Sequence, residues 1–158
     1  MRASARAGRA RACDDPLSLP RRTQGDAKGR RKVEIFKEFT FEAAHQLPYV
    51  PPGHKCSRLH GHSFRVAVHL EGPVDERAGW VRDFADVADT MAPLLACLDH
   101  RYLNEIDGLE NPTSEVLARW IWDRLRLALP ELSQIVVRET CNSGCVYRGE
   151  DAGVRGPE

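Results

Sequence analysis

The order in which hydrophobic periodicity changes along this chain limits its fold more than any other feature. The periodic segments are, in order, residues 33–45 and 60–70 with period two, 84–98 and 113–129 with helical spacing, and 135–140 and 146–148 with period two again. Alternation is typical of strands, and apolar residues three or four apart are typical of helices. Because strands and helices come in blocks, the sequence predicts an α+β fold of order ββααββ, an antiparallel four-stranded sheet with two helices on one face.

The N-terminal segment differs in charge from the rest of the chain. Residues 1–32 hold ten basic and three acidic side chains, a net of +7, while the remaining 13 basic and 20 acidic side chains give −7. Residues 1–31 show neither helical nor strand periodicity. We expect residues 1–31 to be a basic, disordered extension, residues 32–150 to form one folded domain and residues 151–158 to be a tail. A transit peptide or a nucleic-acid-binding arm would have a similar composition, but composition alone favours neither, and we expect no nucleic-acid partner.

Two classes of protein are excluded by the hydrophobic runs and the cysteines. The longest apolar runs, such as residues 92–98, span a few residues, whereas a membrane-spanning helix needs about 20. Five unevenly spaced cysteines in 158 residues do not resemble a small secreted disulfide scaffold, and the N-terminus has no apolar signal core. We therefore expect a cytoplasmic protein with no membrane partner, whose thiols serve chemistry or metal binding.

Three histidines lie at the ends of the first two predicted strands. His60 and His62 are two residues apart and share one strand face, and His45 falls on the apolar face of the preceding strand. Three imidazoles can occupy three corners of a zinc tetrahedron and leave the fourth open, as catalytic zinc sites do. The alternatives are an accidental His-x-His pair and a closed structural site with Cys56 as fourth ligand. The shared phase of the three histidines with the apolar strand residues favours the open zinc site.

Cys56 and the Asp99-His100 pair are the candidate proton-transfer groups. Cys56 stands among His54, Lys55 and Arg58, and positive charge of this kind lowers a thiol's pKa and favours the thiolate. Asp99 and His100 end the first predicted helix, where a carboxylate can orient an imidazole that carries a proton. Neighbours in sequence rarely hydrogen-bond directly, so we expect a partner from another subunit. A plain loop thiol and a solvated acid beside a helix-terminal cation are the alternatives.

Glu139 is a candidate binding residue. The alternation predicts that it shares a strand face with Ile135 and Val137. A carboxylate on an apolar face is costly unless it is paired. We expect it to bind a ligand, and a structural ion pair is the alternative.

Several separated motifs, in order, carry a resemblance to a known family. They are Phe41-Glu42-Ala43-Ala44-His45, Gly53-His54-Lys55-Cys56-x-x-Leu59-His60-Gly61-His62, Trp80-x-x-Asp83-Phe84, Leu98-Asp99-His100-x-Tyr102-Leu103-Asn104, Asn111-Pro112-Thr113-Ser114-Glu115 and Glu139-Thr140. From about residue 32 to residue 150 the chain resembles the 6-pyruvoyltetrahydropterin synthase superfamily, and within it the bacterial carboxy-forming branch. The resemblance implies a tunnelling fold and a homo-oligomer, usually a hexamer of two stacked trimers, with active sites at subunit interfaces.

The resemblance also implies roles for the candidate residues. His45, His60 and His62 match the family's zinc ligands, Cys56 its catalytic cysteine, Asp99 and His100 its acid-histidine pair, and Glu139 its pterin-anchoring glutamate. The position of Cys56, with three residues between it and the His-Gly-His motif, resembles the carboxy-forming branch. A variant branch that serves folate synthesis places a glutamate in this loop, and no glutamate lies between Glu42 and His62.

The implied activity is that of a zinc-dependent carbon-carbon lyase. It would convert 7,8-dihydroneopterin triphosphate to 6-carboxy-5,6,7,8-tetrahydropterin, acetaldehyde and triphosphate, in the biosynthesis of queuosine, a 7-deazaguanine. The alternative enzyme is a 6-pyruvoyltetrahydropterin synthase, which eliminates triphosphate without carbon-carbon cleavage. Outside catalysis, a zinc-binding assembly module and a nucleic-acid-binding protein with a basic arm are the rival classes.

Overall fold

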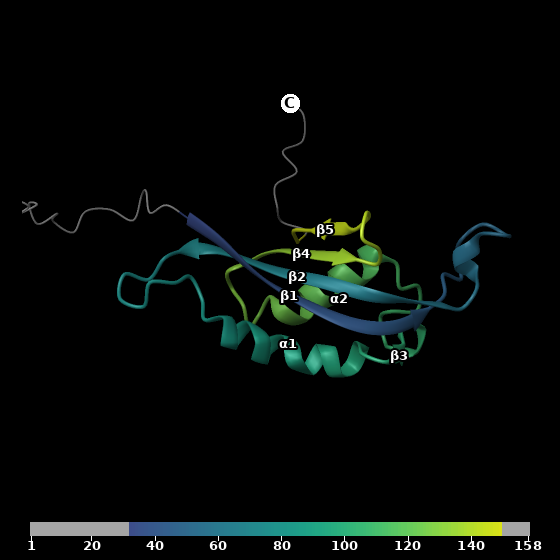
Figure 1. The fold of residues 1–158 in the computed structure, drawn as a ribbon, viewed down its shortest axis with the longest axis horizontal. Coiled ribbons are helices and arrows are strands. Elements are labelled where there is room, and N and C mark those ends of the chain that lie inside the picture. The colour runs from purple at the N-terminus through teal and green to yellow at the C-terminus, as the bar shows by residue number, and fades with distance from the viewer. Residues whose placement is uncertain (1–31, 150–158) are drawn as a thin grey trace, which may run out of the picture.

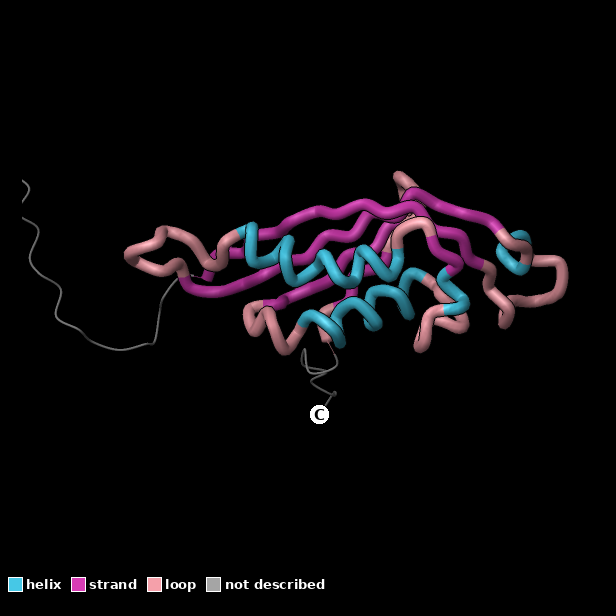
Figure 2. Tube along the Cα trace, turned by 90° about the horizontal axis from the view of Figure 1, so that it is seen from below, coloured by secondary structure: helices cyan, strands magenta, loops and turns pink. Residues whose placement is uncertain are grey.

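The computed structural model describes residues 32–149 as a twisted sheet covered on one face by two helices. The helices are α1 (Phe84–Leu98) and α2 (Ser114–Leu125). Figure 2 shows them side by side against the same face of the sheet, and the opposite face carries no helix. The predicted α+β class and the single helical layer are confirmed. The predicted basic extension and C-terminal tail lie outside the described residues.

Two long strands form the centre of the sheet. β1 (Lys32–His45) and β2 (His60–Pro73) pair antiparallel along their whole length. The register runs from Lys32 opposite Pro73 to His45 opposite His60. The ends of both strands that meet at the 46–59 connection therefore carry histidines directly across from each other (Figure 1).

The sheet has five strands in the order β3-β1-β2-β4-β5, so the expected number of four was wrong. β4 (Leu132–Arg138) and β5 (Cys145–Tyr147) are antiparallel to their neighbours, while β3 (Arg101–Tyr102) lies parallel to β1. A strand of two residues has no periodicity that a sequence can reveal. It forms because the chain after α1 passes along the edge of β1.

The core lies between the helices and one face of the sheet. Its fully buried side chains alternate along β1, β2 and β4 and recur at helical spacing in α1 and α2, among them Phe64, Val66, Met91, Ile121 and Ile135. Helix α2 ends at Leu125, four residues before the predicted end. The turn that follows, in which the Leu129 backbone N–H donates to the carbonyl of Leu125, places Leu129 in the core.

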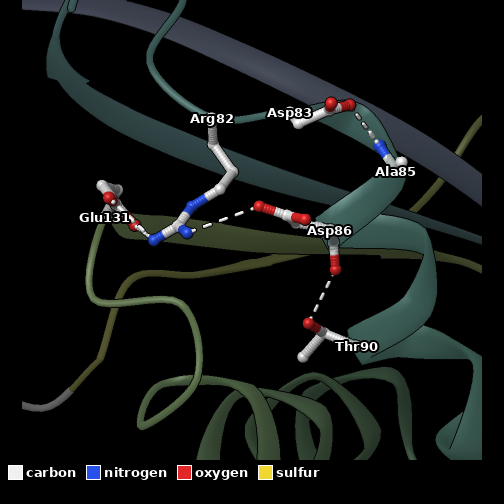
Figure 3. Close-up of polar contacts among 6 residues, drawn as sticks. All are labelled: Arg82, Asp83, Ala85, Asp86, Thr90 and Glu131. Carbon is white, nitrogen blue, oxygen red and sulfur yellow. Dashed lines mark hydrogen bonds and ion pairs between the residues drawn. The ribbon is translucent and has the colours of Figure 1, made fainter.

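Helix α1 begins at a polar cluster that also anchors the loop before β4 (Figure 3). The Asp83 carboxylate accepts a hydrogen bond from the Ala85 backbone N–H and caps the helix. The Arg82 guanidinium donates to both carboxylate oxygens of Glu131, at 3.0 and 2.9 Å, and lies 3.6 Å from the Asp86 carboxylate. These contacts tie the start of α1 to the segment that leads into β4. Within the described part of the chain, no helix has the length and apolarity needed to cross a bilayer.

Candidate metal centre and active site

The three predicted histidines converge at the end of the β1–β2 pair. One ring nitrogen from each of His45, His60 and His62 lies within 4.8 Å of the others. Within residues 32–149 this is the one group of three or more His, Cys, Asp or Glu side chains with such convergent ligand atoms. His45 and His60 are cross-strand partners, and His62 follows on the same face of β2. The strand register thus brings together residues that the sequence separates by 15 positions.

Backbone carbonyls fix the orientation of two of these rings. Nδ1 of His45 contacts the Pro112 carbonyl oxygen at 2.9 Å, and Nδ1 of His60 contacts the Arg58 carbonyl oxygen at 2.8 Å. A carbonyl only accepts, so Nδ1 carries a proton in both rings, and in the neutral form of each ring the Nε2 lone pair faces the other ring. Those two Nε2 atoms are 3.1 Å apart. Two facing lone pairs repel each other unless a cation lies between them, so the donor set fits a metal ion bound by imidazole.

Burial keeps His45 in the form that binds metal. Only 1% of the residue is exposed. Burial lowers the pKa of His45 below its ordinary value, against an upward influence of the Pro112 carbonyl and of the Glu139 charge. The neighbouring His60 and His62 lower this pKa further. The imidazole is therefore neutral at physiological pH, as coordination requires.

Gly61, between the two β2 histidines, is a residue whose role the sequence reasoning missed. A Cβ atom at this position would lie 3.2 Å from the carbonyl oxygen of Ala43. β1 and β2 approach each other closely here, and a side chain would push them apart. The glycine inside the His-x-His spacing was the available signal, because an isolated glycine in a strand indicates a close backbone approach.

Cys56 lies in the turn that connects the two histidine-bearing strand ends. It is the middle residue of a short 3₁₀ helix, η1 (Lys55–Ser57), and its backbone N–H donates to Nδ1 of His54. The Cys56 carbonyl accepts a hydrogen bond of 2.8 Å from the Leu47 backbone N–H, two residues after His45. The thiol is half-buried and forms no disulfide. The Cys56 backbone is thus tethered to the chain two residues after His45.

Asp99 and His100 contact each other directly, and the expectation that neighbours would not do so was wrong. The Asp99 carboxylate lies 2.9 Å from Nδ1 of His100. His100 has a φ of 56°, in the left-handed region, which turns its ring back toward the preceding residue. Asp99 also accepts a hydrogen bond from the Glu42 backbone N–H, and this bond, with the contact to His100 next in size, lowers the pKa of its carboxyl. The carboxylate is therefore ionised at neutral pH and can orient the imidazole.

An open groove runs beside this pair. It is lined by residues of β1, β2 and the β3 edge, including Glu42, His62, Ser63, His100, Arg101 and Tyr102. His62 and His100 therefore border one groove, although His62 lies in β2 and His100 lies in the turn between α1 and β3. The His100 side chain is 77% exposed. This exposure leaves the imidazole accessible to a bound molecule or to a second subunit.

Glu139 is close to the cluster, but it does not lie in a strand. β4 ends at Arg138, and Glu139 is the first residue of the bend that follows. The prediction of a strand position was wrong by one residue, because the alternation of Ile135 and Val137 continues past the last ladder pair. The side chain is half-buried, and its charge raises the pKa of His45. Glu139 therefore lies within electrostatic reach of the histidines.

Comparison with known proteins agrees with this arrangement. The family model described as 6-pyruvoyl tetrahydropterin synthase matches residues 34–150. A Synechocystis protein described as 6-carboxy-5,6,7,8-tetrahydropterin synthase is 46% identical over 119 residues, which cover 72% of this chain and 91% of the relative. A Bacillus subtilis protein with the same description is 31% identical over 135 residues, covering 78% of this chain and 90% of the relative.

The fold has a close counterpart among solved structures. The Caenorhabditis elegans 6-pyruvoyl tetrahydropterin synthase superposes with a TM-score of 0.70 at 27% identity, covering 75% of this chain and 96% of that one. The histidine cluster, both helices and strands β2 to β5 lie within residues 34–150, which the family model matches. With a family model that matches most of its length and relatives of this similarity, the chain belongs to the 6-pyruvoyl tetrahydropterin synthase family of enzymes.

Proposed function

We propose that this protein is a zinc-dependent 6-carboxytetrahydropterin synthase. Its substrate is 7,8-dihydroneopterin triphosphate, and its products are 6-carboxy-5,6,7,8-tetrahydropterin, acetaldehyde and triphosphate, in a route toward queuosine. The observation that carries the proposal is the convergence of three histidine nitrogens within 4.8 Å beside a tethered Cys56. The 46% identity to the Synechocystis synthase supports the choice of product.

The metal ligands in this proposal are His45, His60 and His62. The Pro112 and Arg58 carbonyls hold two of the rings with Nε2 inward. The three imidazole nitrogens would hold the ion. A zinc ion bound there supplies Lewis acidity to the side-chain oxygens of the pterin, which makes the adjacent carbon protons easier to remove.

Proton movement is assigned to Cys56 and to the Asp99-His100 pair. The Cys56 thiolate takes a proton from the substrate side chain. His100 returns or relays a proton through Nε2, because Asp99 holds its Nδ1 at 2.9 Å. The Glu42 backbone fixes Asp99, so the pair has a defined orientation at the edge of β1.

Substrate orientation is assigned to Glu139. A carboxylate accepts two hydrogen bonds side by side, which matches the 2-amino and ring N–H groups of a pterin. Its half-buried position next to the histidine cluster supports this role. Anchoring the ring at this point fixes the side chain against the metal and the thiol.

The assembled enzyme is proposed to be a homohexamer with active sites between subunits. His100 and Asp99 are exposed by 77% and 45% of their side chains at the rim of an open groove. Because the groove is open to solvent, water is excluded from a reaction there only when a neighbouring subunit covers it.

Product analysis tests the proposal directly. The purified protein is incubated with zinc and 7,8-dihydroneopterin triphosphate, acetaldehyde is trapped with alcohol dehydrogenase and NADH, and the pterin product is identified by mass spectrometry. We expect acetaldehyde and triphosphate in equal amounts and a pterin that bears a 6-carboxyl group. His60→Ala, which lacks a metal ligand, should release neither.

The alternative is a 6-pyruvoyltetrahydropterin synthase, supported by the fold likeness to the nematode enzyme at 27% identity. In that case triphosphate is released without acetaldehyde, and the product bears a pyruvoyl side chain. The metal, base and anchor roles of the residues would remain the same.

A further inference from the structure

Asn104 makes three hydrogen bonds, all with backbone groups near the histidine cluster. It lies in a short 3₁₀ helix, η2 (Leu103–Glu105), directly after β3. Its amide oxygen accepts from the Gln46 backbone N–H at 3.0 Å, and its amide nitrogen donates to the Gln46 carbonyl at 2.8 Å. The same nitrogen donates to the Glu110 carbonyl at 3.0 Å. Both amide N–H groups are therefore used, and the side chain is half-buried among these partners.

The two bonds to Gln46 continue the sheet beyond its last strand pair. β3 ends with Tyr102 opposite Ala44, and the chain then turns into η2. The Asn104 amide takes the place of a peptide group and pairs with Gln46, the first residue after β1. Asn104 thus holds Gln46, which lies between His45, a proposed metal ligand, and Leu47. The Leu47 N–H in turn donates to the Cys56 carbonyl.

The third bond reaches the segment that orients His45 from its other side. Glu110 precedes Pro112 by two residues, and the Pro112 carbonyl contacts Nδ1 of His45. One side chain thus links the backbone that carries His45 to the backbone that fixes the His45 ring.

The segment that ends at Asn104, residues 99–104, also carries Asp99 and His100. At its start, the His100 backbone N–H donates to the Glu42 carbonyl, and Asp99 accepts from the Glu42 N–H. At its end, Asn104 binds Gln46. Residues 99–104 are therefore hydrogen-bonded to Glu42 before His45 and to Gln46 after it. These contacts connect the proposed proton-transfer pair to the backbone that carries the proposed metal ligand His45.

We propose that Asn104 is a positioning residue that sets His45 and the Cys56 turn for catalysis without touching the substrate. The inference rests on the proposed metal site. An amide is needed because a carboxylate at this position would face the carbonyls of Gln46 and Glu110 with no proton to donate. Loss of such an orienting contact typically weakens metal binding by roughly 10- to 100-fold.

The test compares metal affinity in the full chain and in matched variants. Zinc affinity is measured by competition with a chromophoric chelator, and the visible spectrum of the Co²⁺-loaded protein reports the ligand geometry. Asn104→Asp keeps the shape and removes both donors, while Asn104→Ser removes all three bonds without adding charge. Asn142→Asp is the control for replacing an amide with a carboxylate. The Asn142 side-chain oxygen accepts a hydrogen bond from the Thr140 hydroxyl, and a carboxylate can accept the same bond. Leu125→Ala, a cavity in the core at α2, is the control for lost stability.

We expect both Asn104 variants to lower zinc affinity by roughly 10- to 100-fold and to change the Co²⁺ spectrum, while both controls retain the spectrum and an affinity within about twofold of the original. If Asn104→Asp does not fold, the zinc affinity and the Co²⁺ spectrum of Asn104→Ser test the positioning role. Unchanged affinity in the Asn104 variants, or an equal loss in Leu125→Ala, overturns the positioning role. Absence of zinc binding in the unaltered protein would instead overturn the metal site, and the inference with it.

Discussion

At the level of single residues, the proposed metal ligands are distinct from the proposed proton acceptor. The inward nitrogens belong to His45, His60 and His62, and Cys56 is outside this set. Cys56→Ala should therefore keep zinc and fold but lower kcat by about 10²-fold or more, since a positioned base contributes on that scale. Metal content, circular dichroism and turnover are the measurements. Cys97→Ala, an exposed thiol in α1, is the control. Loss of zinc from the Cys56 variant would support a closed site in which the thiolate is a ligand.

Glu139 allows binding to be separated from chemistry. Glu139→Gln replaces one acceptor oxygen with an N–H₂ group, which opposes a donor of the pterin ring. We expect KM to rise by about tenfold or more with a smaller change in kcat, because a hydrogen bond to a charged group contributes about 1.5–3 kcal/mol. Steady-state kinetics measure both constants. Glu38→Gln, on the exposed face of β1, serves as the control. A fall in kcat at constant KM would contradict the anchoring role.

The sequence predicted the histidine cluster because all three residues share the phase of the buried strand positions. It did not predict the direct Asp99-His100 contact, since that contact depends on a left-handed φ of 56° at His100. A positive φ at a residue other than glycine is fixed by tertiary contacts, here the bond of the His100 N–H to Glu42, and leaves no local pattern.

At the level of elements, the start of α1 depends on its cap. The Asp83 carboxylate satisfies the Ala85 N–H, one of the unpaired donors of the first turn. Asp83→Ala should lower the free energy of unfolding by about 1 kcal/mol. Thermal or urea unfolding measures the change. Asp89→Ala, exposed inside the same helix, removes a carboxylate without removing a cap and should not destabilise the protein. Equal stability of the two variants would show that the cap contributes nothing.

The limits of prediction for elements follow from length. β1, β2 and α1 are 14, 14 and 15 residues long. The predicted bounds of β1 and α1 are correct to within one residue, and β2 continues three residues past its predicted end at residue 70. β3 has two residues, and Asn104 extends its pairing with a side chain, so neither could be read from periodicity. The position of Glu139 was missed for a related reason, because alternation does not mark where a ladder of hydrogen bonds ends.

At the level of the whole molecule, the core of the described residues is built from segments that follow residue 31. Its buried side chains run from Phe41 to Val137, and the first strand begins at Lys32. The helix-free face of the sheet presents Phe36 and Val146, which are 56% and 47% exposed and available to other subunits. The groups proposed for assembly and for catalysis therefore all lie after residue 31.

A chain that begins at Arg31 should keep the activity and the oligomeric state of the full chain. The reason is that truncation there removes none of the buried residues between Phe41 and Val137 and none of the site residues between His45 and Glu139. Size-exclusion chromatography with light scattering measures the assembly, and the acetaldehyde assay measures the activity. The full-length protein under the same conditions is the control. A truncated protein that dissociates, or that assembles but loses turnover, would show that residues 1–31 belong to the functional enzyme and would contradict the proposed division of the chain.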